Sequence, residues 1–303
     1  MKSTVLTTTS SFSSNEFDES LNVIHNPYGR RLSESEVKEL IEIHQPIGMI
    51  AGIEPLTRDV LESADNLKVI SRCGIGLDSV DLEAANELGI SVLNTPEAPK
   101  EAVAELTLGM ILSVLRHIPT LNQNIRNGNW KGPKGLLLKG KTIGIIGCGR
   151  IGSRLAELLK PFKCALIGYD PAIKAHDLIH MTNLDDLIES ADILTLHIPL
   201  TTDTKNILSG IKIKQLKRDA IIINAARGGL VDEKTLYEEL KNGHLYGAAL
   251  DCFAEEPYSG PLKELNNVIL TPHMGSSTIK TRTIMENNAV ENLMSELSRL
   301  GLN

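Results

Sequence analysis

The sequence predicts an α/β protein with two doubly wound parallel-sheet domains and a cleft between them. The first would be a flavodoxin-like substrate domain and the second a Rossmann dinucleotide-binding domain. Strand-like apolar runs alternate with helix-like patterns, which is typical of parallel sheets covered by helices. A turn-rich segment at 94–99 separates two such series, and the second series opens with a glycine motif. We expect domains of residues 1–96 with 277–303, and of residues 97–276.

Composition excludes several functional classes. The 303 residues are 42% hydrophobic, which is enough for two ordinary cores, and the net charge is −7. An acidic chain is not expected to bind nucleic acid or an anionic membrane surface. No apolar run approaches the ~18 residues of a membrane span, and the N-terminal segment lacks the features of a signal or transit peptide. We therefore expect a cytoplasmic protein.

The four cysteines are scattered, without the paired spacing of a metal site. They are Cys73, Cys148, Cys164 and Cys252. We expect buried, reduced thiols and no metal centre.

The first domain is predicted from five strand-like runs with helical patterns between them. Ser33 and Glu36 form a capping box that opens a helix, and Asp81 is placed to cap a helix that Gly89 ends. The expected strands are 3–8, 21–25, 47–51, 69–72 and 90–94.

A long apolar helix is expected at 101–117 and should be buried. The segment 119–140 looks irregular, and either packs on its own chain or forms an arm that clasps a second subunit. The last helix, 279–300, should return to the first domain. The second domain is expected to have six strands, at 142–146, 164–169, 192–197, 220–224, 247–251 and 267–271, with helices at 151–160, 184–190, 213–217 and 233–241.

The glycine motif is Gly147-x-Gly149-x-x-Gly152, between a strand and a helix. Gly147 permits the turn, Gly149 lets the backbone approach a pyrophosphate, and Gly152 lets helix and strand pack closely. The phosphates would lie at the positive end of the helix. Asp170 ends the next strand, where its carboxylate would accept from a ribose hydroxyl and repel the 2′-phosphate of NADP, so we expect NAD.

Polar residues follow three later strands of the second domain. Arg227, Asp251 and His273 come at or just after these strand ends, and Glu256 follows soon after Asp251. Carboxyl ends of parallel strands form the ligand edge of such a sheet. Each residue alone could be a surface ion-pair partner, a solvated turn residue or a loop histidine, but their joint placement favours a site.

This set fits hydride transfer at a carbon that bears oxygen. His273 would donate a proton to the carbonyl oxygen of a 2-oxo acid and remove it in the reverse direction. Glu256 would stabilise the imidazolium, and the fork of Arg227 suits a substrate carboxylate. Asp251 would bind the nicotinamide carboxamide.

The chain resembles the D-isomer-specific 2-hydroxyacid dehydrogenases, nearest to the D-3-phosphoglycerate dehydrogenase branch. The resemblance extends from about residue 47 to 285. The matching motifs are Gly74–Asp78, Asn94–Pro96, Val103–Thr107, Gly147–Gly152, Tyr169–Pro171, His197–Thr201, Asn224–Asp232, Gly247–Asp251, Glu256–Pro257 and Thr271–His273.

The resemblance implies a catalytic set of Arg227, Glu256 and His273, and a homodimer formed through the cofactor domain. Further implied substrate contacts are Gly74, Ile75 and Gly76, besides Arg227 and His273, and Arg72 is an additional candidate from its position in the sequence. The implied NAD contacts are Ile75, Arg150, Ile151, Asp170, His197, Ile198, Pro199, Ala225, Ala226, Arg227, Asp251, His273, Gly275 and Ser276, besides the three glycines.

Two departures bear on the substrate. Phosphoglycerate dehydrogenases tend to present an Arg-Ser pair near the substrate phosphate, whereas this chain has residues 51–54 there. A substrate phosphate would meet Glu54, which is unfavourable by charge. Arg72 could compensate, or could be a surface arginine. The sequence also ends soon after the last helix, so we expect a short form without the C-terminal regulatory domain.

Several functions stay open at this stage. The substrate could be 3-phosphoglycerate, or an unphosphorylated acid as in lactate dehydrogenases and glycerate or glyoxylate reductases. An NAD(H)-sensing interaction protein on the same fold is a further alternative. A formate dehydrogenase is disfavoured because such enzymes lack the acidic partner that Glu256 supplies.

Overall fold

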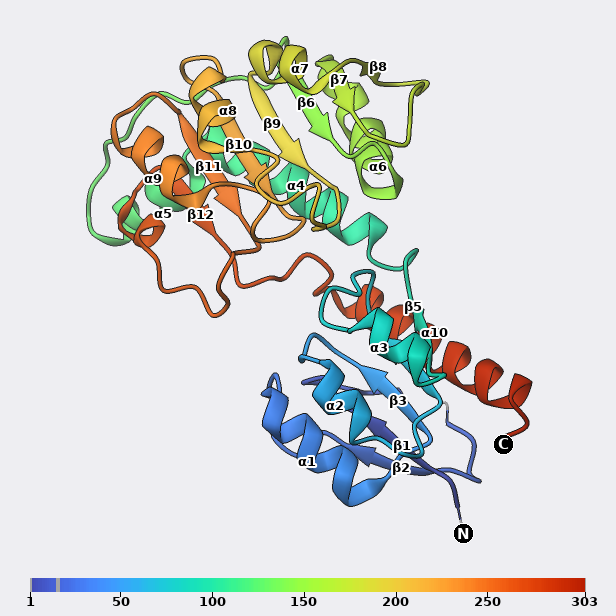
Figure 1. Ribbon diagram of the computed structural model, residues 1–303. Coiled ribbons are helices and arrows are strands. Elements are labelled where there is room, and N and C mark those ends of the chain that lie inside the picture. The colour runs from blue at the N-terminus through green and yellow to red at the C-terminus, as the bar shows by residue number, and fades with distance from the viewer. Residues whose placement is uncertain (1, 15–16, 303) are drawn as a thin grey trace. The chain divides into compact units, whose positions relative to one another are not determined.

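The computed structural model describes residues 2–14 and 17–302, which fall into two compact units (Figure 1). One unit comprises the residues up to Pro99 and those from Ser276 onward, and the other is Lys100–Gly275. The predicted first boundary is residue 96, whereas residues 97–99 also belong to the first unit, where Ala98 packs against the core. Thr95 is tied to the same unit, because its backbone N–H donates to the Gly74 carbonyl and its hydroxyl accepts from the Gly74 N–H.

The first unit contains a five-stranded parallel sheet with the order β2-β1-β3-β4-β5. This is the flavodoxin-like order, as predicted. Strands β3 and β4 are buried throughout, since helices cover both faces. The strands are β1 (Thr4–Thr7), β2 (Asn22–His25), β3 (Gly48–Ala51), β4 (Val69–Arg72) and β5 (Ser91–Asn94).

Three helices cover one face of this sheet, namely α1 (Glu34–His44), α2 (Arg58–Glu62) and α3 (Leu82–Glu87). The predicted capping box is confirmed, because the Ser33 hydroxyl accepts from the Glu36 N–H and the Glu36 carboxylate accepts from the Ser33 N–H. Asp81 caps α3 through the Ala84 N–H, again as predicted.

The opposite face is covered by α10 (Ile279–Arg299), from the other end of the chain. Its Leu293 and Leu297 pack with Val5, Ile50 and Val69 of the sheet. Alternate strand residues point to opposite faces, so each central strand supplies both cores. The predicted return of the last helix, which makes the first unit discontinuous, is confirmed.

The second unit contains a seven-stranded parallel sheet with the order β12-β11-β10-β9-β6-β7-β8. The prediction of six strands is wrong because β8 was missed. That strand pairs with β7 over two residues, too few to show a hydrophobic period. The strands are β6 (Thr142–Ile146), β7 (Ala165–Tyr169), β8 (His180–Met181), β9 (Ile193–Leu196), β10 (Ile221–Asn224), β11 (Gly247–Leu250) and β12 (Val268–Leu270).

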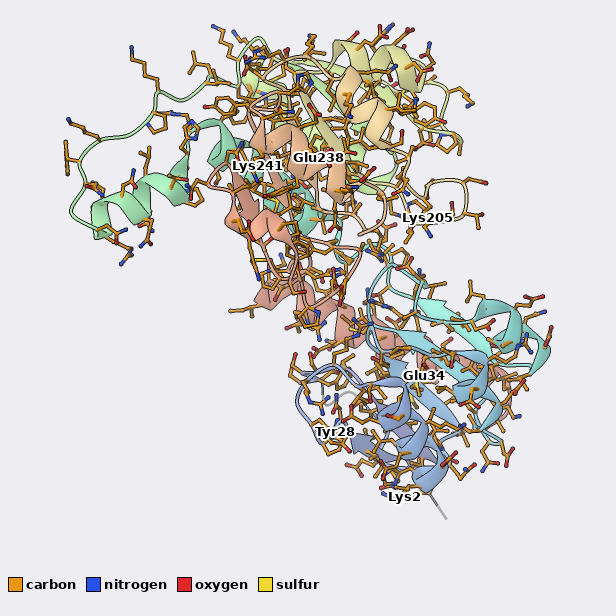
Figure 2. All side chains as sticks on the ribbon, turned by 60° about the vertical axis from the view of Figure 1, so that its left-hand side comes forward. Lys2, Tyr28, Glu34, Lys205, Glu238 and Lys241 are labelled. Atoms are coloured by element: carbon orange, nitrogen blue, oxygen red, sulfur yellow. The ribbon has the colours of Figure 1, made fainter. Side chains whose placement is uncertain are left out.

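Helices cover both faces of this sheet as well. Buried residues of α4 and α6 pack on one face, and those of α7, α8 and α9 pack on the other. The outer faces carry charged side chains such as Glu238 and Lys241 of α9 (Figure 2). The helices are α4 (Lys100–Leu115), α5 (Ile118–Arg126), α6 (Arg150–Leu159), α7 (Leu184–Ser190), α8 (Gly210–Gln215) and α9 (Glu233–Lys241), with short 3-10 turns η1 (Lys160–Phe162) and η2 (Pro261–Glu264).

The expectation of an irregular segment from 119 to 140 is wrong at its start, where α5 forms. Pro119 lies in the first turn of this helix, where proline is tolerated. A helical spacing of apolar residues was present in this segment, at Ile118, Leu121 and Ile125. None of the residues of α5 is buried, whereas α4 buries most of its apolar side chains.

Within the described ranges, no single helix has both the length and the apolar composition to cross a membrane; only the bent pair α4 and α5 passes together, by length and composition alone.

Shortening Leu293 should destabilise the first unit, because this buried side chain fills the space beside Gly48. We expect Leu293→Ala to lower the free energy of unfolding by about 2–5 kcal/mol. Ile279→Ala on the same helix should change it by less than about 0.5 kcal/mol, since Ile279 is 92% exposed. Urea unfolding of both variants measures this, and equal effects would contradict the packing described.

Candidate active site

The carboxyl ends of β10, β11 and β12 lie side by side, because these parallel strands are neighbours in the sheet. Asn224 ends β10, Asp251 follows β11, and Thr271 follows β12. The three predicted catalytic residues lie in the loops beyond these ends. The topology therefore puts them on the ligand edge of the sheet.

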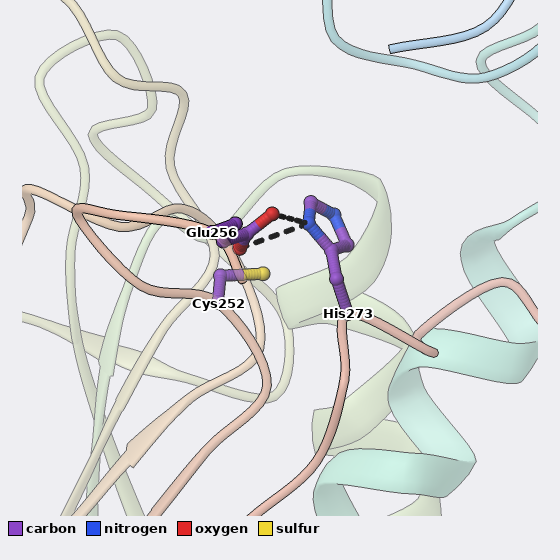
Figure 3. Close-up of side chains that lie close together, drawn as sticks. All are labelled: Cys252, Glu256 and His273. Carbon is purple, nitrogen blue, oxygen red and sulfur yellow. Dashed lines mark hydrogen bonds and ion pairs between the residues drawn. The ribbon is translucent and has the colours of Figure 1, made fainter. Parts of the chain in front are cut away.

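His273 and Glu256 form the pair that the sequence analysis predicted (Figure 3). The Nδ1 of His273 lies 2.9 Å from Glu256 Oε2 and 3.1 Å from Oε1. A carboxylate only accepts, so we assign the hydrogen to Nδ1. The Phe253 N–H also donates to Oε1, which holds the carboxylate in place. The His273 side chain is 32% exposed and that of Glu256 22%, so Nε2 is left for chemistry.

Asp251 is buried and fixes the loop that carries His273. Its carboxylate accepts from the Thr271 hydroxyl (2.6 Å), the Met274 N–H (2.8 Å) and the Gly275 N–H (2.8 Å). Its carbonyl accepts from the His273 N–H (2.8 Å). The expected role of Asp251 was a nicotinamide contact, whereas the structure shows a carboxylate engaged by its own chain.

Arg227 lies in a loop shaped by Asn224. The Asn224 amide donates to the Arg227 carbonyl (2.8 Å) and accepts from the Ala226 N–H (3.1 Å). The Arg227 guanidinium donates to the Ala226 carbonyl (2.8 Å). A Cβ on Gly228 would lie 1.9 Å from the Phe253 carbonyl, so this loop touches the one that leads to Glu256.

The glycine motif has the geometry that its spacing predicts. Gly147 has φ +95°, and a Cβ there would lie 2.5 Å from the His197 carbonyl oxygen. A Cβ on Gly152 would lie 2.1 Å from the Gly147 carbonyl oxygen, so close helix–strand packing requires this glycine. Gly149 has no neighbour within 4 Å of such a Cβ, so the space above it is open to a ligand.

Asp170 links the end of β7 to the glycine motif. Its Oδ2 accepts from the Cys148 N–H (2.9 Å), and its Oδ1 accepts from the Ala172 (2.8 Å) and Ile173 (3.1 Å) N–H groups. A carboxylate has about four acceptor positions, so room for one more donor remains.

His197 lies after β9, beside Gly147. Its Nε2 contacts the Thr195 hydroxyl at 3.0 Å, and its buried Nδ1 has no partner among the described residues. Burial lowers the pKa of His197 from 6.5 to about 4, so the ring is neutral near pH 7.

The remaining predicted cofactor contacts of the second unit lie on the same edge. Arg150 and Ile151 are in the first turn of α6, Ile198 and Pro199 follow β9, Ala225 and Ala226 follow β10, and Gly275 follows β12. Ser276, the next residue in the chain, and Ile75 belong to the first unit.

The predicted substrate residues of the first unit follow β4. Gly74 has φ +148°, and a Cβ there would lie 1.4 Å from the Arg72 Nη1, so the guanidinium lies directly beneath the loop. Arg72 also donates to the Cys73 carbonyl. Gly74 is hydrogen-bonded to Thr95, as described above, and the Asn94 amide donates to the Ile75 carbonyl (2.7 Å). Gly76 follows in the same loop. Arg72 is thus buried and is not a surface arginine.

Glu54 does not present its carboxylate to a ligand, contrary to the expectation from sequence. It is buried and accepts from the Thr8 hydroxyl and the Gly52 N–H (2.9 Å). Arg282 and Glu286 of α10 were not predicted as part of a site. Arg282 donates to Glu286 (3.0 Å), and the separation of four residues on a helix was the available signal.

Glu233 is another missed residue, at the start of α9. Its carboxylate accepts from the Ala254 N–H (2.7 Å). Burial, together with the charge of Glu256, raises the pKa of Glu233 above its usual value. It therefore supports the loop between Asp251 and Glu256.

Comparison with known proteins identifies the second unit. Residues 108–275 match the family model of the D-isomer specific 2-hydroxyacid dehydrogenase, NAD binding domain. The D-3-phosphoglycerate dehydrogenase of Methanocaldococcus jannaschii is 46% identical over 82% of this chain, which spans only 48% of that protein. The hydroxypyruvate reductase of Thermotoga maritima is 40% identical over 86% of this chain and 89% of its own.

The whole fold is also similar to solved structures. The crystal structure of the TT0316 protein from Thermus thermophilus has a TM-score of 0.89 and 36% sequence identity, and the match covers 97% of each chain.

Two glycine variants separate folding from cofactor binding. Gly152→Ala should destabilise the protein by about 1–3 kcal/mol, because its Cβ meets a backbone carbonyl. Gly149→Ala should leave stability unchanged. It should weaken NADH binding by more than roughly tenfold, which corresponds to a loss of about 1.4 kcal/mol in the free energy of binding. Thermal unfolding and NADH fluorescence titration measure the two effects; unchanged NADH affinity in Gly149→Ala would refute the assigned site.

His197 should make stability depend on pH. In the folded state the ring stays neutral down to about pH 4, whereas an unfolded histidine binds a proton below about 6.5. Protonation then favours unfolding, so stability falls as the pH is lowered through this window. His197→Gln should lose less stability than the wild type between pH 7 and pH 5 in urea unfolding. If wild type and His197→Gln lost the same free energy of unfolding between pH 7 and pH 5, His197 would not be neutral in the folded protein.

Proposed function

The chain belongs to the D-isomer specific 2-hydroxyacid dehydrogenase family, and we propose that it is an NAD-dependent oxidoreductase acting on a D-2-hydroxy acid or the matching 2-oxo acid. The observation that carries this proposal is the His273–Glu256 pair, at 2.9 Å, on the ligand edge of the NAD-binding unit. A histidine held by a carboxylate is the arrangement that proton transfer to or from a substrate oxygen requires.

In the reductive direction the chain supplies the proton. The hydride for the carbonyl carbon would come from NADH held along the glycine motif. His273 donates its Nε2 proton to the carbonyl oxygen as negative charge develops there. Glu256 keeps its hydrogen bond to Nδ1, and so stabilises the imidazolium before transfer and fixes the ring. In the oxidative direction neutral Nε2 accepts the hydroxyl proton.

Arg227 is proposed to bind the substrate carboxylate and to polarise the carbonyl group. Its guanidinium offers a planar fork of donors. The loop of Gly74, Ile75 and Gly76 is proposed to hold a substrate carboxylate through the backbone N–H groups of Ile75 and Gly76, since the Gly74 N–H already donates to the Thr95 hydroxyl. The buried Arg72 beneath Gly74 adds positive charge to this loop, which favours an anionic substrate.

Asp170 is proposed to give the preference for NAD. One acceptor position remains on its carboxylate for a ribose hydroxyl, and its charge repels a 2′-phosphate. A nicotinamide contact by Asp251 would have to use its one remaining acceptor position.

The charges of the first unit favour an unphosphorylated substrate. Arg72 and Arg282 are accompanied by Glu54 and Glu286, so positive charge is balanced rather than in excess. All four act on the thiol of Cys73, whose pKa burial raises to about 11. A phosphate dianion would gain little from this balanced group. 3-Phosphoglycerate remains the alternative, and its oxidised form belongs in the test.

The test is the loss of NADH absorbance with a panel of 2-oxo acids that includes 3-phosphohydroxypyruvate, hydroxypyruvate, glyoxylate and pyruvate. We expect turnover of an unphosphorylated acid. Rapid turnover of the phosphorylated acid alone would transfer the assignment to phosphoglycerate oxidation. Failure of every acid, with NADH still bound, would overturn the enzymatic proposal in favour of an NAD(H) sensor.

Substitutions in the pair should lower turnover without loss of cofactor binding. We expect His273→Gln to reduce kcat by roughly 10²- to 10⁴-fold, because the proton donor is lost. Glu256→Gln should cause a smaller loss, since a glutamine oxygen still accepts from Nδ1 but carries no charge. Arg227→Ala should raise KM as well.

The matched control is Glu255→Gln, which removes an exposed carboxylate next to Glu256 in sequence. It should leave kcat and KM unchanged. If His273→Gln kept wild-type turnover, or if the control variant lost as much as Glu256→Gln, the assigned roles would be wrong.

We further propose a homodimer formed through the NAD-binding unit. Large apolar side chains are exposed along the segment 118–137, including Ile118, Ile125, Leu137 and Trp130, which is 90% exposed. Analytical ultracentrifugation should give a molar mass of twice the 33.0 kDa of one chain. Trp130→Ser with Leu137→Ser should shift the mass towards one chain, whereas Ile211→Ser, at an exposed site on α8, should not.

A further inference from the structure

Cys252, Glu256 and His273 bring three metal-binding donor atoms together at the ligand edge of the second unit (Figure 3). One sulfur, one nitrogen and one oxygen all lie within 4.8 Å of one another. We propose that these three residues bind a Zn²⁺ ion, and that the bound ion inhibits the enzyme. This site goes beyond the catalytic pair because its third ligand, Cys252, has no part in hydride or proton transfer.

The donor set suits zinc in particular. Thiolate, imidazole and carboxylate are its usual ligands, at about 2.3 Å for sulfur and 2.0–2.2 Å for nitrogen and oxygen. Two such ligands on a tetrahedral ion lie about 3.5 Å apart by these lengths. The nitrogen and oxygen donors, now 2.9 Å apart, would move apart by about 0.5 Å, and the Cys252 sulfur, within 4.8 Å of both, would move in by about 1 Å. Harder ions such as Mg²⁺ avoid sulfur.

The surrounding chain holds the three donors in place. Cys252 directly follows Asp251, whose carboxylate is fixed by the 271–275 loop. The Cys252 thiol is buried and donates to the Ala226 carbonyl at 3.4 Å, a proton that the ion would displace. The Phe253 N–H donates to Glu256 Oε1 and holds this carboxylate in place. The partly exposed sides of His273 and Glu256 give the ion its entry route.

Inhibition follows from where the ion binds. At His273 Nδ1 it takes the place of the hydrogen shared with Glu256. The neutral ring then carries its one remaining hydrogen on Nε2, so Nε2 cannot accept a proton from a hydroxyl group. Glu256 is bound to the metal and no longer stabilises an imidazolium. The loss of turnover rests on the proposed function, whereas metal binding itself does not.

The first experiment measures binding without substrate. Zn²⁺ is titrated calorimetrically into metal-free wild type, Cys252→Ala and Cys164→Ala, and Co²⁺ is added as a spectroscopic substitute. We expect one ion per chain and a thiolate-to-cobalt charge-transfer band in the wild type and in Cys164→Ala, where a different partly buried thiol is removed. Cys252→Ala should lose the band and bind Zn²⁺ at least roughly tenfold more weakly.

The second experiment measures turnover in the presence of Zn²⁺. Wild type and Cys164→Ala should be inhibited and should recover on addition of a chelator, and Mg²⁺ should have no effect. Cys252→Ala should keep its basal turnover and resist Zn²⁺. If Cys252→Ala does not fold, as judged by NADH binding, Cys252→Ser keeps the side-chain size and should still lose the cobalt band.

A cobalt spectrum without a thiolate band, or equal Zn²⁺ affinity in wild type and Cys252→Ala, would overturn the proposed site. Binding that is normal but leaves turnover unchanged would overturn the inhibition alone. If no 2-oxo acid is turned over, the cobalt spectrum still decides the metal site, so failure of the enzymatic proposal is distinguished from failure of this one.

Discussion

The buried carboxylate of Asp251 is the constraint on which the proposed active site depends. It is removed from water, and its charge is satisfied by three donors from the 271–275 loop. Moving that loop would leave a buried charge without its hydrogen-bond donors, which costs free energy. His273, with its positive φ of 50°, is therefore held at one point above the sheet, within reach of Glu256.

A second layer of backbone contacts supports the same geometry. Gly228 lies against the Phe253 carbonyl, the Phe253 N–H holds Glu256, and Glu233 holds the Ala254 N–H. The loops after β10 and β11 thus brace each other. This bracing sets the distance between a proton-transferring histidine and its carboxylate, on which proton transfer depends. It also brings the Cys252 thiol beside them, so one arrangement holds both the proposed catalytic pair and the proposed metal ligands.

The first unit balances buried charges in a different way. Arg72 lies beneath the Gly74 loop, Glu54 is turned to its own backbone, and Arg282 pairs with Glu286. An anion at this loop would meet local positive charge from Arg72 but no net excess around it. The proposed preference for an unphosphorylated substrate therefore depends on side chains from distant parts of the sequence.

The sequence alone determined the two α/β units, the strand–turn–helix at Gly147, and the pairing of His273 with Glu256. These follow from local patterns, since hydrophobic periods, caps and glycine spacings act within a few residues. The tertiary structure decided what distant segments do to one another. It turned Glu54 inward, engaged Asp251 with the His273 loop, and set Cys252 beside His273. None of these has a local signal, because each depends on a side-chain direction or on a contact that only the packed sheet creates.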